Sequence, residues 1–86
     1  MHTVELLEQA VDLARRMGYL VRQEWLGGIG GGGCELGGRK VIFIDLALGP
    51  VDQLDQVLCA LRREPGALAA PMPHQLRELL AVRRSA

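Results

Sequence analysis

Metal chemistry would depend on four side chains, because Cys34, Cys59, His2 and His74 are the only cysteines and histidines of the chain. Structural zinc sites usually take their ligands in close pairs, such as two cysteines or two histidines a few residues apart. None of these four residues has another of them at such a spacing. We therefore expect no metal, with Cys34 buried in a hairpin, Cys59 buried in a helix and both thiols reduced.

Nucleophilic or acid–base catalysis also has few candidate residues. The single serine and the single threonine both lie within three residues of an end of the chain. A nucleophile such as Cys34 would need a histidine base beside it, and no spacing in the sequence indicates such a pair. Asp45, Asp52 and Asp55 end a predicted strand or open a predicted helix, where carboxylates ordinarily interact with the helix dipole. The sequence predicts a domain with no catalytic residue and no cofactor.

Glycine occupies six of the seven positions 27–33, and the run contains the spacing G-x-G-x-x-G. In dinucleotide-binding proteins a helix follows these glycines and its N-terminus meets the pyrophosphate. Here a strand follows, so the pattern favours a hairpin loop or bulge over a phosphate site. So much glycine is costly to order, and we interpret the segment as one that another backbone or a peptide approaches closely. The candidate ligand or partner residues are Gly27, Gly28, Gly30, Gly31, Gly32, Gly33, Glu35 and Asp45.

Hydrophobic periodicity and turn residues predict the elements that would position this loop. They are a helix over 4–17, a strand over 19–26, two strands over 34–36 and 39–45, and helices over 51–62 and 74–83. Gly37 and Gly38 predict a two-residue turn between the second and third strands, because both positions of such a turn can need positive φ. Residues 63–73, with three prolines, predict an irregular connector to the last helix.

We expect these elements to form a single α+β domain over residues 1–86. Short connections favour a three-stranded antiparallel meander packed against the three helices, in the order α-β-β-β-α-α. With aromatics at 3% of the chain, the core is expected to consist of aliphatic residues with contributions from Tyr19, Trp25 and Phe43. The strands over 19–26 and 34–36 are the expected edges of the sheet.

The charge balance limits the classes of partner. Ten basic and ten acidic residues give a formal net charge of zero, which predicts binding to neither nucleic acid nor an anionic membrane. The sequence has no run of about 18 apolar residues that could span a bilayer. Together with two unpaired cysteines, these features predict a cytoplasmic protein.

A family resemblance comes from the order of a helix ending in glycine, a strand, a hairpin written CELGGRKVIFID, and a helix soon after it. This order over residues 5 to about 63 is similar to a minimal zincin-like domain of the ImmA/IrrE metallopeptidase family, whose helix after the hairpin carries H-E-x-x-H. The resemblance places the three motif positions near Gln56, Val57 and Ala60. None of these residues can bind zinc or act as the general base, so the resemblance implies a shared fold without the peptidase chemistry.

Two functions remain open from the sequence. The first is a non-catalytic interaction or regulatory domain that binds a protein partner or forms a homo-oligomer. Its surface would be the sheet edge and the final helix, because a small sheet cannot cover all the apolar side chains of three helices. The alternative is a degenerate hydrolase-like domain that binds a peptide or small ligand near the glycine-rich loop. A pocket beside residues 27–33 containing Asp45 or Glu35 would favour the alternative, and a flat apolar surface at the sheet edge or on the last helix would favour interaction.

Overall fold

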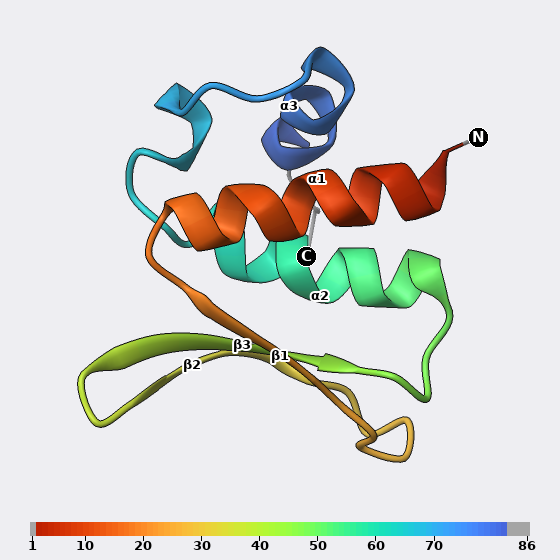
Figure 1. The fold of residues 1–86 in the computed structure, drawn as a ribbon. Helices are drawn as coiled ribbons and strands as arrows, with labels where there is room; N and C mark the ends of the chain where they lie inside the picture. The colour runs from red at the N-terminus through yellow and green to blue at the C-terminus, as the bar shows by residue number, and fades with distance from the viewer. Residues whose placement is uncertain (1, 83–86) are drawn as a thin grey trace.

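A computed structural model describes residues 2–82 of the chain, which form helices on one side of a small sheet (Figure 1). In chain order the elements are α1 (Thr3–Arg16), β1 (Leu20–Glu24), β2 (Gly32–Leu36), β3 (Arg39–Asp45), α2 (Pro50–Arg62), the 3-10 helix η1 (Ala67–Ala69) and α3 (His74–Ala81). The predicted α+β class is confirmed. The predicted end of the last helix, at residue 83, lies outside the described residues.

The sheet is mixed, so the predicted antiparallel meander is wrong. Its strand order is β1-β3-β2, with β1 parallel to β3 and β2 antiparallel to it. The central strand β3 pairs Val41 with Leu20 on one side and with Cys34 on the other. Residues 41–44 of β3 are all apolar, which suits a strand with neighbours on both sides, whereas β2 begins with two glycines. The edges of the sheet are β1 and β2, as predicted.

The glycine-rich loop explains how β1 and β2 come to lie on opposite sides of β3. Residues 25–31 carry the chain from the end of β1 past the end of β3, and β2 then returns antiparallel to both (Figure 1). The two-residue turn between β2 and β3 is as predicted, because Gly37 and Gly38 have φ of 56° and 82°.

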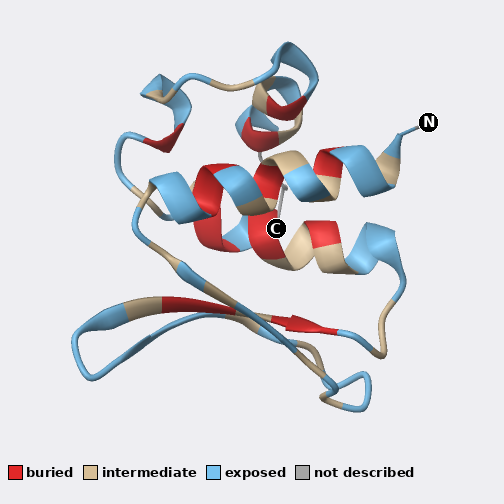
Figure 2. Ribbon diagram, viewed as in Figure 1, coloured by how far each residue is buried: buried red, intermediate tan, exposed pale blue. Residues whose placement is uncertain are grey.

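The helices all lie on one side of the sheet, with α1 and α2 between the sheet and α3 (Figure 1). Figure 2 shows the buried residues on the adjoining faces of α1 and α2 and along β3. Leu13, Ile42 and Leu61 are fully buried at this interface, and α3 adds Leu76 from the far side of α1 and α2. None of the described elements covers the opposite face of the sheet, which we call the open face (Figure 1).

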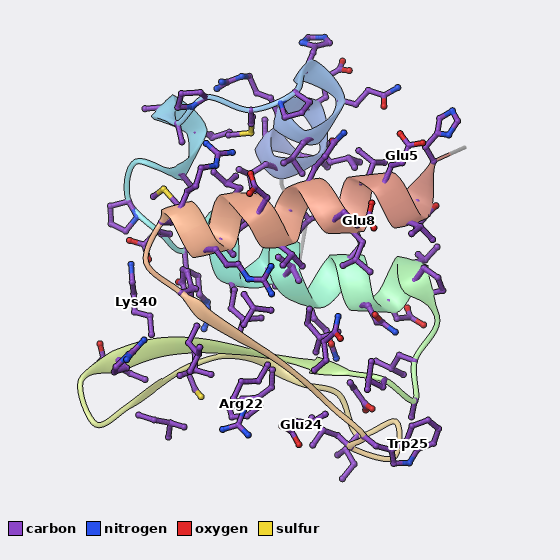
Figure 3. The ribbon with its side chains drawn as sticks, viewed as in Figure 1. Glu5, Glu8, Arg22, Glu24, Trp25 and Lys40 are labelled. Carbon is purple, nitrogen blue, oxygen red and sulfur yellow. The ribbon has the colours of Figure 1, made fainter. Side chains whose placement is uncertain are left out.

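Lys40 fastens the ends of the two long helices to the sheet. Its side chain rises from β3 toward the helices in Figure 3, and Nζ donates to the Met17 carbonyl at 2.8 Å and to Glu64 Oε1 at 3.0 Å. The same ammonium lies 4.8 Å from the centre of the Tyr19 ring. The hydrogen bond from Lys40 lowers the pKa of Glu64, while burial, followed by the neighbouring Glu64, raises the pKa of Tyr19.

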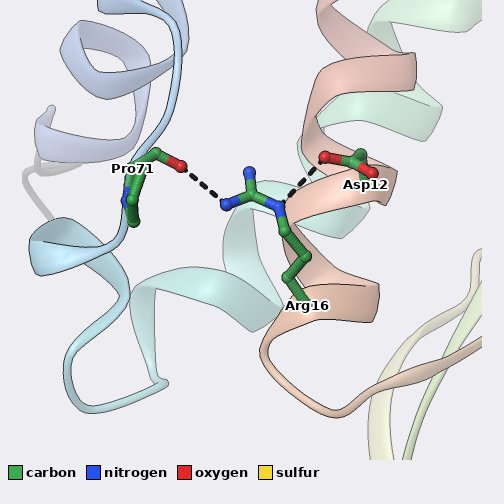
Figure 4. Close-up of polar contacts among 3 residues, drawn as sticks. All are labelled: Asp12, Arg16 and Pro71. Atoms are coloured by element: carbon green, nitrogen blue, oxygen red, sulfur yellow. Dashed lines mark hydrogen bonds and ion pairs between the residues drawn. The ribbon is translucent and has the colours of Figure 1, made fainter.

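Arginine side chains order the predicted connector. Arg16, at the end of α1, donates from Nη1 to the Pro71 carbonyl at 2.8 Å and from Nε to Asp12 Oδ2 at 3.0 Å (Figure 4). Arg77 of α3 donates to the carbonyls of Leu68 and Ala70. The connector, which includes η1, is therefore tied to both α1 and α3.

Three expected burials are wrong. Trp25 follows the end of β1 and is 73% exposed, so it lies outside the core. Cys34 and Cys59 are both exposed and free. Cys34 points to the open face from an edge strand, and Cys59 lies on the side of α2 that faces away from the core, positions that periodicity alone did not predict.

Candidate functional site

Asp45 is fully buried at the end of β3 and holds the glycine-rich loop in place. Its Oδ1 accepts the N–H groups of Leu26 at 3.0 Å and Ala47 at 2.9 Å, and its Oδ2 accepts those of Gly28 at 2.8 Å and Gly30 at 3.0 Å. Burial by itself raises the pKa of this carboxyl, but the four amide hydrogen bonds outweigh it and lower the pKa below its ordinary value. The carboxylate is therefore ionised at neutral pH and fully engaged by backbone.

Glycine is needed where the loop curls around this carboxylate. Gly28 and Gly30 have φ of 86° and 95°, values that residues with a side chain rarely adopt. This backbone conformation turns their N–H groups toward Asp45 Oδ2. Gly31 is needed for a different reason, since a Cβ there would lie 1.9 Å from the carbonyl oxygen of Phe43. Gln56 of α2 supports the same region by accepting the Asp45 backbone N–H at 3.2 Å.

The outer edge of β2 presents unpaired backbone groups. The two-residue turn is closed by hydrogen bonds between its flanking residues, Leu36 and Arg39. Pairing in an antiparallel ladder alternates, so the N–H and C=O groups of Gly33 and Glu35 point away from β3. Among the described elements, only β3 pairs with β2. This edge can therefore accept another strand.

On the helix side of this edge lies a groove of about 670 Å³ between β2 and α2, which we call the edge groove. It is lined by residues 31–33, Cys59, Ala60, Arg62 and Arg63. Gly33 lies close to α2, because a Cβ there would be 3.0 Å from the Ala60 Cβ.

The charge in the edge groove comes from its two arginines. Arg62 donates to the carbonyls of Leu79 at 2.8 Å and Leu80 at 3.3 Å, so it is held by α3. Arg63 is exposed and has no hydrogen-bond or ion-pair partner among residues 2–82. The groove therefore offers a cation to an acidic side chain.

On the other side of the same edge, the open face carries an apolar hollow of about 370 Å³, which we call the apolar cup. It is lined by Leu26, residues 30–33, Cys34 and Phe43. Leu36 and Leu20 on the same face are 54% and 43% exposed. The absence of a side chain at Gly32 leaves the cup open toward the edge of β2.

The loop adds exposed apolar side chains at one end of the molecule. Trp25, Ile29 and Leu46 are 73%, 91% and 43% exposed, and residues 25–34 contain no charged side chain. Figure 3 shows Trp25 near the turn of the loop, with Arg22 and Glu24 on the adjoining part of β1. Exposed aromatic and aliphatic residues of this kind are typical of protein-binding surfaces.

The structure separates the predicted ligand residues into two groups. Gly27, Gly28, Gly30 and Asp45 form the loop around the buried carboxylate, where Asp45 has structural partners. The other four, Gly31, Gly32, Gly33 and Glu35, form or border the β2 edge.

Sequence reasoning missed the helix side of the edge, which is formed by Cys59, Ala60 and Arg63. The i, i+4 spacing of Cys59 and Arg63, at the C-terminal end of α2, was the signal that could have placed these two side chains near each other.

The remaining candidate residues do not form a cluster. No group of three or more His, Cys, Asp or Glu residues that could hold a metal ion occurs among the described residues. His2 and His74 lie in separate local pairs with Glu5 and Glu78. At the three positions implied by the zincin resemblance, Gln56 supports the Asp45 backbone, Val57 is fully buried and Ala60 faces Gly33. None of these three side chains is a zinc ligand or a general base, and each makes contacts within the fold.

A second apolar groove lies on the other side of the molecule, between the first turns of α1 and α2 and the helix α3. It has a volume of about 470 Å³, and its lining includes Leu6, Val51, Leu54 and Leu79. This is the surface of the final helix that the sequence predicted as part of an interface. It is separate from the β2 edge.

Comparisons with protein-family models, with curated proteins and with solved structures found no match. Within the described part of the chain, no helix is long and apolar enough to cross a membrane.

Proposed function

We propose that this domain is a non-catalytic interaction module that binds a polypeptide partner as an added strand at the outer edge of β2. The observation that carries this proposal is the free edge at Gly33 and Glu35, which lies between the edge groove and the apolar cup. An added strand gains affinity from backbone hydrogen bonds and specificity from pockets that receive its alternate side chains. The two hollows lie on opposite faces of the sheet, as an added strand requires.

The two edges of the sheet differ in how well they resist such pairing. On β1, Arg22 and Glu24 form an ion pair at 3.1 Å, and charged side chains on an edge strand discourage pairing with other chains. On β2, Glu35 is the only charged side chain, and residues 32 and 33 have no side chain at all. These differences support β2 as the edge that accepts a partner.

A degenerate zincin-like domain that binds a peptide is the second candidate. It is favoured by the placement of Gln56 and Ala60, which lie one turn apart on α2 and face Gly30 and Gly33. However, neither hollow beside the glycines is lined by Asp45 or Glu35, the feature that would have favoured a ligand-binding pocket. The interaction module is therefore better supported than the degenerate zincin-like domain.

Selection of extended peptides on the folded domain, at a protein concentration too low for self-association, tests the proposed function. The decisive variants are Glu35→Pro, which removes an outward N–H without touching the β2–β3 ladder, and the matched control Glu35→Ala, which keeps it. Circular dichroism establishes that both variants fold. We expect Glu35→Pro to weaken the selected peptides at least tenfold relative to Glu35→Ala. Equal binding by the two variants, or selected peptides that bind only the groove beside α3, would contradict the proposal.

A further inference from the structure

We propose that the strand added to β2 is the β2 of a second copy of this chain, related to the first by a two-fold axis beside Cys34. This inference rests on the proposed function and names its partner. A two-fold interface uses the same patch on both copies, so that patch must be complementary to itself. The β2 edge meets this requirement in its backbone, on its helix side and on its open face.

The backbone sets the register. Only residues with outward N–H and C=O groups can form hydrogen-bonded pairs across the new interface, and on β2 these are Gly33 and Glu35. An axis beside Cys34 places Gly33 opposite the partner's Glu35 and Glu35 opposite the partner's Gly33. Each of these two pairs exchanges both of its hydrogen bonds, and the result is a continuous six-stranded sheet.

The helix side supplies a charge match. Glu35 lies on the same face as Gly33 and Lys40, the face toward α2, and its side chain is exposed. When the partner's Glu35 lies opposite Gly33, its carboxylate enters the edge groove beside Ala60, where Gly33 has no side chain to obstruct it. Arg63, which is free of partners among the described residues, then faces an acid. The two-fold axis repeats this contact on the other copy.

The open face supplies an apolar match in the same register. Residue 36 of the partner lies opposite Gly32, and both residues point to the open face. The partner's Leu36 therefore lies over the apolar cup, whose walls are Leu26, Cys34 and Phe43. Leu36 is 54% exposed in the single chain, so its burial in the cup stabilises the pair.

Two neighbouring registers, shifted by two residues in either direction, also pair residues through their outward N–H and C=O groups. Both are less favourable. An axis beside Glu35 sets the two Glu35 carboxylates directly opposite each other, which is destabilising. An axis beside Gly33 places the partner's Cys34 opposite Gly32, so the partner's Leu36 no longer lies over the apolar cup. The Cys34 register also brings the two Cys34 Cα atoms to about 4.5 Å, within the range of a disulfide, whereas a shift by two residues separates them beyond about 7 Å.

The test combines mass, cross-linking and charge reversal on the full chain under reducing conditions, with an oxidant added only for cross-linking. Light scattering at about 100 μM should give a mass near twice 9.4 kDa. Diamide should then join two Cys34 thiols into one disulfide, as it takes up their two hydrogens and two electrons. Mass mapping should find the Cys34–Cys34 peptide, and Cys34→Ser should abolish the cross-link while leaving the reduced dimer.

Charge reversal tests the contact between Glu35 and the partner's Arg63. Glu35→Arg and Arg63→Glu should each weaken the dimer about tenfold or more, and the double variant should recover most of this loss. A monomer at 100 μM, a cross-link that maps to Cys59, or a double variant weaker than either single variant would overturn the inference. The proposed function fails separately, because the peptide comparison of Glu35→Pro with Glu35→Ala is made on the monomer.

Discussion

Replacing Gly31 by alanine is the sharpest test of how the loop reaches β2. A Cβ at this position would lie 1.9 Å from the Phe43 carbonyl oxygen and 2.6 Å from its carbon, whereas real Cβ contacts stay beyond 3.0 Å. The chain must therefore shift by about 1 Å at the point where β2 begins. Overpacking that displaces backbone costs about 1–3 kcal/mol, and we expect about 3 kcal/mol because a main-chain carbonyl cannot rotate away.

Gly27→Ala is the matched control for this variant. Gly27 has φ of 72°, so alanine there is strained, but no atom lies within 4 Å of its added Cβ. We expect this control to cost about 1–2 kcal/mol. Urea unfolding followed by circular dichroism should separate the two variants by at least about 1 M in midpoint, given a slope near 1 kcal/mol per molar for so small a domain. Equal midpoints, or a more stable Gly31→Ala variant, would refute the close approach of residues 31 and 43.

Three further predictions concern the carboxylate, the contact with α2 and metal. The folded-state pKa of Asp45 is lowered, so its stabilisation is present above an unfolded pKa of about 3.9 and is lost as the pH falls through the folded value. Asp45→Asn should therefore be less stable than the parent at pH 7, with a difference that shrinks toward pH 2 in urea titrations; a pH-independent difference would contradict this. Gly33→Ala should cost about 1 kcal/mol through its contact with Ala60, and combining it with Ala60→Gly should be less destabilising than the sum by about 1 kcal/mol in a double-mutant cycle. Protein purified without chelator should contain far less than one zinc per chain by elemental analysis, and stoichiometric zinc that survives dialysis would overturn the non-catalytic assignment.

Elements defined by local sequence could be predicted. The apolar stripes of α1 and α2 have helical spacing, and the pair Gly37 and Gly38 specifies its turn because both positions require positive φ. The strand order could not be predicted from short connections, because it depends on contacts between distant residues. The apolar run of residues 41–44 was the available signal that β3 takes the centre, since such runs suit a strand covered on both sides.

Only part of the candidate site could be predicted, because the rest of it also depends on contacts between residues distant in the sequence. Glycine-rich sequence indicated a loop that something approaches closely, and the approaching group proved to include the Asp45 carboxylate and the Phe43 carbonyl of the chain itself. That Asp45 lies within reach of three loop amides depends on the parallel pairing of β1 with β3. Likewise, Arg63 lies beside Gly33 only because α2 packs across β2, a contact that no local pattern contains.

Amide hydrogen exchange at Gly33 and Glu35 tests the central claim most directly. Both N–H groups point away from β3 and have no hydrogen-bond acceptor among residues 2–82, so they should exchange rapidly in dilute protein. Saturation with a selected peptide, or self-association at high concentration, should slow both amides together while Cys34, already paired with Val41, changes little. If binding leaves Gly33 and Glu35 in rapid exchange and protects residues of α1 or α3 in their place, the outer edge of β2 is not the binding surface.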